Sequence, residues 1–199
     1  MQRPPDIWVF FGMIATGKST LAEAWAKRHH LAHYNSDRLR KELAGLPPTT
    51  REVEAPGQGI YSRDFTLRTY NELLDRARNE IAAGNSVILD ASYQQKSERD
   101  RVRMLAADHG TRICFVYCIC PEDVVKERLV KRSRDQEAVS DGRWEIYQAQ
   151  KERFATPDEL PDDILIKIYT DQPIDALLDH LEAMSVGLGK APGRMDSAG

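Results

Sequence analysis

Close to its N-terminus the chain reads Gly12-Met13-Ile14-Ala15-Thr16-Gly17-Lys18-Ser19. A glycine, four residues and then Gly-Lys-Ser/Thr is the pattern of a phosphate-binding loop, or P-loop. Residues 7–11 before it are apolar and β-prone, which predicts a buried strand, and residues 20–27 after it favour a helix. Strand, glycine-rich loop and helix therefore follow one another in the order that nucleotide binding requires.

The loop predicts a site for ATP with Mg²⁺. Two glycines allow the main chain to curl around an anion, and the following helix presents unpaired N–H groups and its positive dipole end. Lys18 is expected to reach the β- and γ-phosphates and to act in catalysis, and Ser19 to hold Mg²⁺. The predicted nucleotide-binding residues are Gly12, Met13, Ile14, Ala15, Thr16, Gly17, Lys18, Ser19 and Thr20.

Length and composition indicate one domain without a large excess of positive or negative charge. The chain has 199 residues and a formal net charge of −3, and we expect its domain to span residues 1–186. Residues 187–199 are rich in Gly, Pro and polar residues and are expected to be a disordered tail. No apolar run approaches a membrane span and no signal-peptide stretch is present, so we expect a cytoplasmic protein without membrane contact. The charge balance disfavours extended nucleic acid, and leaves a small molecule or a 5′-hydroxyl end as partner.

Three cysteines lie close together at positions 114, 118 and 120, where a strand would direct them to one face. They could serve a metal or redox site, or be small core residues in a reducing compartment. No second Cys or His pair stands at zinc spacing nearby, so we favour the core role and expect no zinc site.

Alternating strands and helices predict an α/β fold: a P-loop NTPase three-layer sandwich with a mostly parallel five-stranded sheet, helices on both faces and a basic lid. The expected strands are 7–11, 31–35, 86–91, 112–119 and 164–169, and the expected helices are 20–27, 37–44, 62–83, 97–108, 121–132, 140–154 and 173–184. The helix at 97–108 is expected to open with a capping box at residues 97–100. The strand order stays open, but ligands of such sheets bind at the carboxyl ends of the strands.

Asp90 closes the apolar run Val-Ile-Leu at 87–89. A carboxylate at this place is typical of the element that holds Mg²⁺ beside a P-loop, directly or through water. We therefore predict a metal or substrate role for Asp90, although an Asp at a strand end also serves as an ordinary helix cap.

Asp37 and Arg40 follow the second expected strand and share one helix face. If that strand neighbours the first, Asp37 would stand near the γ-phosphate, where a carboxylate can take the proton of an attacking hydroxyl. Arg40 would bind an anionic part of the acceptor. The alternative is that Ser36 or Asp37 caps the helix and Arg40 is a solvated charge.

A basic cluster marks the end of the helix at 121–132 and the polar segment after it. Arg128 and Arg132 are four residues apart and lie on one face, and Arg134 is an alternative that would shift the lid register by two residues. Such cations can stabilise the charge of a transferring phosphoryl group, so we predict a lid at about 128–141 with catalytic Arg128 and Arg132. Favourable charge at a helix C-terminus is the other interpretation.

Taken together, residues from about Ile7 to Phe154 resemble the polynucleotide-kinase-like and zeta-toxin-like branch of P-loop kinases. The resemblance is carried by the P-loop, the Ser36-Asp37-x-x-Arg40 element, the strand end at 89–92 and the Arg128-x-x-x-Arg132 pair with Ser140-Asp141 after it. The runs 40–45 and 87–92 are similar to a bacterial group of kinases that is sometimes fused to an aminoglycoside-phosphotransferase-like domain.

The resemblance implies that Asp37 is a general base, that Arg40 binds an acceptor phosphate, and that Arg128 and Arg132 grip the donor. The loop departs from the commoner Gly-x-Pro-Gly-x-Gly-Lys form because Ile14 and Ala15 replace Pro and Gly, but the spacing is kept. The expected activity is transfer of the γ-phosphoryl group of ATP to a hydroxyl of a small molecule or a nucleic-acid 5′ end. A nucleotide-dependent regulatory or ATPase module and a zeta-toxin-type nucleotide-sugar kinase are the alternatives, and the acceptor is left open.

Overall fold

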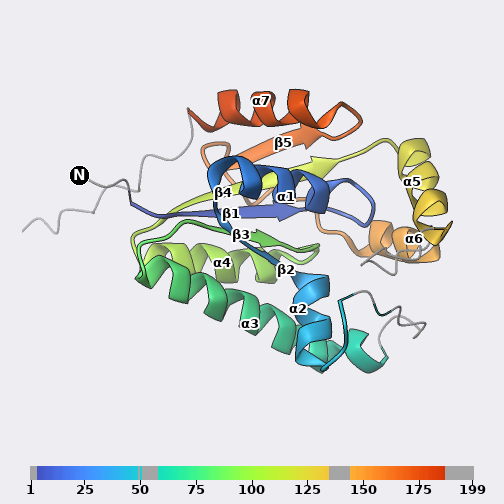
Figure 1. Cartoon of the computed structure of the whole chain (residues 1–199), viewed down its shortest axis with the longest axis horizontal. Coiled ribbons are helices and arrows are strands. Elements are labelled where there is room, and N and C mark those ends of the chain that lie inside the picture. Colours follow the sequence, from blue (N-terminus) through green and yellow to red (C-terminus); the bar gives the residue numbers. More distant parts are fainter. Residues whose placement is uncertain (1–3, 49, 51–57, 135–143, 187–199) are drawn as a thin grey trace, which may run out of the picture.

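The computed structural model describes residues 4–48, 50, 58–134 and 144–186. Within these residues one sheet of five parallel strands forms the centre, as predicted (Figure 1). Its strands are β1 (Asp6–Phe11), β2 (Ala32–Asn35), β3 (Val87–Asp90), β4 (Arg112–Ile119) and β5 (Leu165–Tyr169). The expected segments therefore match the observed strands to within a residue or two at their ends.

The strand order is β2-β3-β1-β4-β5. The condition attached to Asp37, that the second strand neighbours the first, is not met, because β3 lies between them. The register nevertheless aligns their carboxyl ends: Asp90 of β3 pairs with Phe10 of β1 on one side and with Asn35 of β2 on the other. The end of β2 is thus brought level with Asp90 and with the carboxyl end of β1.

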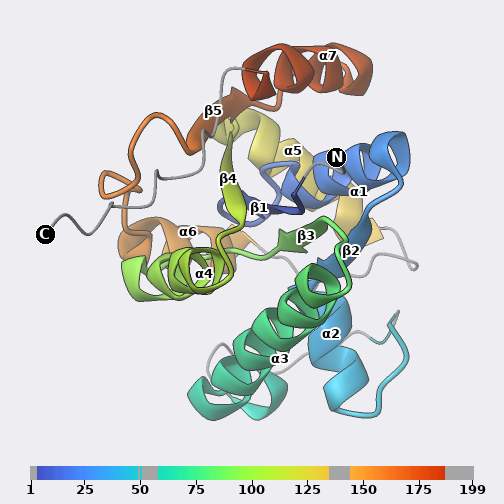
Figure 2. The same cartoon turned by 90° about the vertical axis from the view of Figure 1, so that its left-hand side faces the viewer.

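Helices cover both faces of the sheet (Figures 1 and 2). On one face lie α1 (Lys18–His29) and α7 (Ile174–Ser185), and on the other α3 (Arg63–Ala82) and α4 (Lys96–Asp108). Alternate strand residues supply the two cores, because successive side chains of a strand point to opposite faces. In β1, Val9 and Phe11 pack toward α3 and α4, whereas Trp8 and Phe10 pack toward α1 and α7. Burial on both faces explains why the strands read as continuous apolar runs.

The remaining helices lie toward the carboxyl ends of the strands (Figure 1). They are α2 (Ser36–Leu43), the short 3₁₀ helix η1 (Gly59–Tyr61), α5 (Glu122–Arg134) and α6 (Trp144–Arg153). Ala15, Leu129 and Tyr147 belong to a third, smaller core that joins α5 and α6 to the P-loop. None of the helices in the described part of the chain is long and apolar enough to cross a membrane.

One expected helix start and one alternative interpretation of a helix cap are wrong. α4 begins at Lys96, and its capping box joins Gln95 with Glu98 rather than starting at Ser97. α2 is capped by Asn35, whose side chain accepts hydrogen bonds from the N–H groups of Asp37 and Arg38, so neither Ser36 nor Asp37 is the cap. The predicted tail at 187–199, the predicted helix start at 140–143 and lid residues 135–141 lie outside the described residues.

Candidate active site

The P-loop connects β1 to α1 through three residues with positive φ. Gly12 has φ of 143° and Gly17 has φ of 83°, values that a side chain disfavours. A Cβ atom on Gly12 would stand 2.5 Å from the carbonyl oxygen of Cys118 on β4, so the loop passes too close to the sheet for any side chain. Both glycines are therefore required by geometry as well as by the motif.

Ala15 is the third such residue, with φ of 60°. It occupies the position at which the commoner loop has glycine, and its left-handed conformation costs an alanine about 1 kcal/mol. Its side chain is buried in the small core formed with α5 and α6. The loop therefore keeps the P-loop curl despite the substitution, and the packing of the alanine methyl group offsets the strain.

Arg128 and Thr170 brace the loop from the side of β4 and β5. Arg128 Nη2 donates to the carbonyl of Thr170 at 2.6 Å, and Nη1 lies 3.4 Å from the carbonyl of Ala15. The Thr170 hydroxyl in turn donates to the carbonyl of Thr16. The predicted lid arginine Arg128 thus belongs to α5, and its guanidinium contacts main-chain carbonyls of the loop and of the residue that follows β5. Its predicted contact with the donor stays a prediction.

Asp90 is the best-defined acidic group beside the loop. It is fully buried, and its Oδ2 atom accepts a hydrogen bond from Asn35 Nδ2 at 2.6 Å and lies 3.3 Å from His33 Nε2. Asn35 Nδ2 is also 3.3 Å from the hydroxyl of Ser19. The strand end and the predicted metal ligand of the P-loop are therefore joined through one amide.

Asp90 is held as a carboxylate. Burial raises its pKa, but the hydrogen bond from His33, the charge of Lys18 and the donor of Asn35 together bring the pKa below its usual value. Its second oxygen, Oδ1, is buried without a hydrogen-bond partner among the described residues. A buried anionic oxygen near a serine hydroxyl fits Mg²⁺, which prefers hard oxygen ligands. Ser19 and Asp90 are thus the residues that could hold the cation.

Arg132 lies within electrostatic reach of both Asp37 and Asp90. Asp37 is in the first turn of α2, directly after the Asn35 cap, and is partly buried. Burial and the charge of Arg128 lower the pKa of Arg132, whereas the carboxylates of Asp37 and Asp90 raise it. The predicted base, the predicted metal ligand and a predicted lid arginine therefore gather at the carboxyl edge of the sheet. The side chain of Arg134 is outside the described part.

Arg40 lies buried between α2 and the start of α3. Its Nη1 atom donates to the carbonyl of Ile60 at 2.6 Å and to the hydroxyl of Thr66 at 3.1 Å, and its guanidinium lies over the Tyr61 ring. Its Nε atom is buried with no hydrogen-bond partner among the described residues. Arg40 is thus not the solvated charge of the alternative interpretation. It joins two helices, and its binding of an acceptor stays a prediction.

The sequence reasoning missed Asn35, His33 and Thr170. An Asn directly before the Ser-Asp pair is a strong N-cap signal and could have been recognised. The contact of His33 and Asn35 with Asp90 depends on β2 pairing with β3, and that of Thr170 depends on β5 lying next to β4. These pairings are not local, so no short pattern shows them.

These features define the class of P-loop α/β proteins. They are a strand, a glycine-rich loop with positive-φ residues, a helix N-terminus, and a buried carboxylate beside them. Comparison with known families agrees with this class. The AAA_33 family model, described as an AAA domain, matches residues 7–157, and the chain belongs to this family.

One of the relatives by sequence is a kinase. An uncharacterized protein of Mycobacterium tuberculosis (strain ATCC 25618 / H37Rv) is 34% identical over 144 residues, which are 72% of this chain but only 28% of that protein. A shikimate kinase of Aromatoleum aromaticum is 30% identical over 159 residues, covering 79% of this chain and 82% of that enzyme. Among solved structures, a gluconokinase from Sinorhizobium meliloti 1021 has a TM-score of 0.62 at 21% identity, with 94% of each chain covered.

Proposed function

We propose that this protein is an ATP-dependent phosphotransferase that moves the γ-phosphoryl group to a hydroxyl of a small molecule. The observation that carries the proposal is the junction at Asn35, whose side chain contacts Asp90 and Ser19 and caps the helix that carries Asp37. An anion-binding loop, a candidate cation site and a candidate base thus lie together, which is the set of groups that phosphoryl transfer needs.

Each group has a stated task in this proposal. The loop N–H groups and Lys18 hold the phosphates of ATP, and Ser19 and Asp90 hold Mg²⁺, which when bound neutralises charge on the phosphate oxygens. Asp37 accepts the proton of the acceptor hydroxyl while the hydroxyl oxygen forms a bond to the γ-phosphorus. The bond between the γ-phosphorus and the β–γ bridging oxygen breaks in the same step. ADP and the phosphorylated alcohol are the products.

Two arginines, Arg132 and Arg40, interact with negative charge on the transferring phosphoryl group and on the acceptor. Arg132 supports the transition state, because a partly buried cation stabilises negative charge more strongly than an exposed one. Arg40 orients the acceptor if the acceptor carries an anion. The shikimate kinase among the relatives and the gluconokinase of similar fold are named for shikimate and gluconate, both hydroxylated carboxylates, so a small hydroxylated acid is the first acceptor class to test.

A transfer screen with γ-labelled ATP tests the proposal. The acceptors are hydroxylated carboxylates, neutral sugars, aminoglycosides, nucleotide-sugars and 5′-hydroxyl oligonucleotides, with the Lys18→Ala protein as the blank. Label in one acceptor class supports the proposal and names the substrate. Label in nucleotide-sugars favours the zeta-toxin-type alternative, and label in 5′ ends favours the polynucleotide-kinase-like one. Release of label only to water from every mixture would replace transfer by the nucleotide-dependent regulatory alternative.

A further inference from the structure

Gln150 on α6 makes a direct contact with the P-loop. Its Oε1 atom accepts a hydrogen bond from the N–H group of Ile14 at 2.7 Å, across 136 positions of the chain. Ile14 also packs, together with Met13, against the small core that α5 and α6 share with the loop. Helix α6 therefore supports the outer turn of the loop through both apolar packing and one polar side chain.

This bond fixes one particular peptide unit. The N–H group of Ile14 and the carbonyl of Met13 belong to the same planar peptide, and that carbonyl accepts hydrogen bonds from the Thr16 hydroxyl at 2.8 Å and from the Thr16 N–H at 3.4 Å. The peptide is thus held at both ends, by Gln150 on one side and by Thr16 on the other. The next residue is Ala15, whose positive φ is unfavourable for an alanine. Fixing the preceding peptide helps to hold this strained turn.

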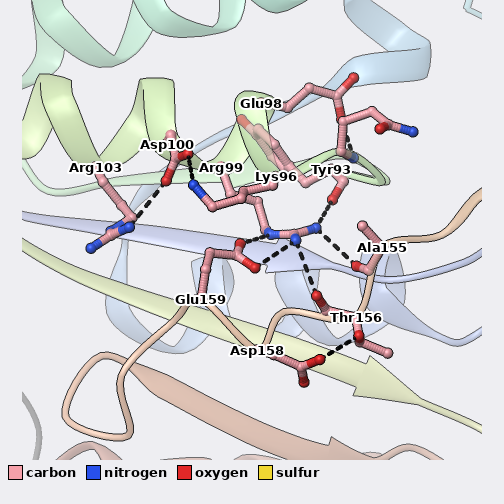
Figure 3. Close-up of polar contacts among 11 residues, drawn as sticks. Tyr93, Lys96, Glu98, Arg99, Asp100, Arg103, Ala155, Thr156, Asp158 and Glu159 are labelled. Carbon is pink, nitrogen blue, oxygen red and sulfur yellow. Dashed lines mark hydrogen bonds and ion pairs between the residues drawn. The ribbon is translucent and has the colours of Figure 1, made fainter.

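The position of Gln150 is itself fixed by the segment that follows α6. The N–H group of Ala155 donates to the carbonyl of Gln94, in the turn that follows β3. The fully buried Arg99 of α4 reaches this segment as well (Figure 3). Its guanidinium pairs with Glu159 at 2.5 Å and donates to the carbonyl of Ala155 at 3.2 Å. The end of α6 is thereby anchored to α4 and to the turn after Asp90.

We propose that Gln150 is a positioning residue for nucleotide binding, which acts through the Met13–Ile14 peptide and not by touching the nucleotide. This role rests on the proposed function, because it requires that the P-loop binds nucleotide. Phosphate-binding loops work because their N–H groups already point at the anion before it arrives. The side-chain oxygen of Gln150 accepts a hydrogen bond from the outer turn of the loop and holds that turn in shape. Less of the loop then has to become ordered when the nucleotide binds.

The test compares three variants of the whole chain. Gln150→Met keeps the length of the side chain and removes the acceptor, whereas Gln150→Glu keeps an acceptor for the Ile14 N–H. Gln148→Met makes the same exchange at an exposed position of the same helix and is the matched control. Hydrogen exchange of the Ile14 amide reports the bond directly, and calorimetry with ADP and Mg²⁺ reports the nucleotide site.

We expect Gln150→Met to lose protection of the Ile14 amide and to bind ADP about five- to tenfold more weakly, as the net value of one hydrogen bond suggests. Gln148→Met should match the wild-type protein in both measurements, and Gln150→Glu should keep the amide protection. Equal ADP affinity in wild-type and Gln150→Met proteins would overturn this role alone. No ADP binding by the wild-type protein would overturn the proposed function and this role with it. If Gln150→Met failed to fold, a loss of Ile14 protection in Gln150→Glu would overturn the proposal and its retention would support it.

Discussion

Asn35 Nδ2 lies 2.6 Å from Asp90 Oδ2, and the oxygen of the same amide caps α2. One side chain therefore sets the start of the helix that carries Asp37 relative to the strand end that carries Asp90. The amide is suited to this because it offers donors on one atom and an acceptor on the other. A serine in its place could cap the helix but could not also reach the carboxylate.

Asn35→Ser should separate these two tasks. We expect thermal stability within a few degrees of the wild-type value, because serine is also a good cap. Activity at limiting Mg²⁺ should fall about 10- to 100-fold, which is typical when an outer-shell partner of a metal ligand is lost. The measurement is a Mg²⁺ activation curve, with Asn35→Ala as the variant that loses both tasks. An unchanged curve for Asn35→Ser would show that the amide does not position Asp90.

Lys18→Ala and Asp37→Ala should differ in what they lose. Both should reduce transfer at least about 100-fold, because one removes a phosphate contact and the other the proton acceptor. Only Lys18→Ala should weaken ATP binding strongly, since Asp37 is assigned to the acceptor. Calorimetry with a non-hydrolysable ATP analogue measures the difference. If Asp37→Ala lost as much ATP affinity as Lys18→Ala, the role of base would be refuted.

Gly12→Ala should abolish nucleotide binding and destabilise the fold. Its Cβ atom would meet the Cys118 carbonyl at 2.5 Å, so the loop or β4 must move. Gly84→Ala is the control, because Gly84 also has positive φ but an added Cβ would meet no atom within 4 Å. The control should lose only about 1 kcal/mol of stability, the cost of a left-handed alanine. Chemical unfolding and ADP titration of both variants measure stability and nucleotide binding. They decide whether the contact of the added Cβ atom with Cys118 or the positive φ angle alone causes the loss.

Glu159→Gln should destabilise the protein by about 3 kcal/mol, because it leaves the buried Arg99 guanidinium without its counter-charge. This corresponds to a fall of about 10 °C in Tm. Glu122→Gln breaks an exposed pair with Lys151 and should cost less than about 1 kcal/mol. Equal losses in the two variants would show that burial of the Arg99 pair carries no special weight.

The same pair predicts a dependence on pH. Burial raises the pKa of Glu159, but the hydrogen bonds from Arg99 outweigh it and bring the pKa below its usual value of 4.5. Glu159 therefore binds its proton more tightly in the unfolded chain than in the folded one. The stabilisation by the Arg99–Glu159 pair is complete above pH 4.5 and is lost as the pH falls through the pKa of Glu159 in the folded protein. The difference in unfolding free energy between wild-type and Glu159→Gln proteins should be full at pH 7 and should narrow as the pH falls below 4.5.

Much of the fold could be predicted because its signals are local. The apolar runs predicted each strand, the loop pattern predicted the turn at Gly12, and Asp90 was recognised as the acidic end of a buried strand. The strand order could not be predicted, because it depends on which strands pair across long stretches of chain. For this reason the neighbour of β2 was left open, and the condition set for Asp37 is not met, although Asp37 still lies within electrostatic reach of Arg132.

The candidate site was less predictable, since a charge pattern does not show what a side chain contacts. Arg40 and Arg128 have the spacing of exposed cations, yet both donate to main-chain carbonyls. Burial of Arg40 requires residues 60–66 to dock on α2, and the bond of Arg128 requires β5 to be in place. Neither condition can be read from the residues around the arginine.

The bond from Thr170 to Thr16 spans 154 positions of the chain. During synthesis the P-loop leaves the ribosome well before Thr170, which follows it by 154 positions. A growing chain therefore lacks the bond from Thr170 to the loop until β5 docks, and we expect it to gain full nucleotide affinity only then. Cellular ATP would accordingly stabilise the completed domain over its partial products, because a ligand stabilises whichever form binds it best.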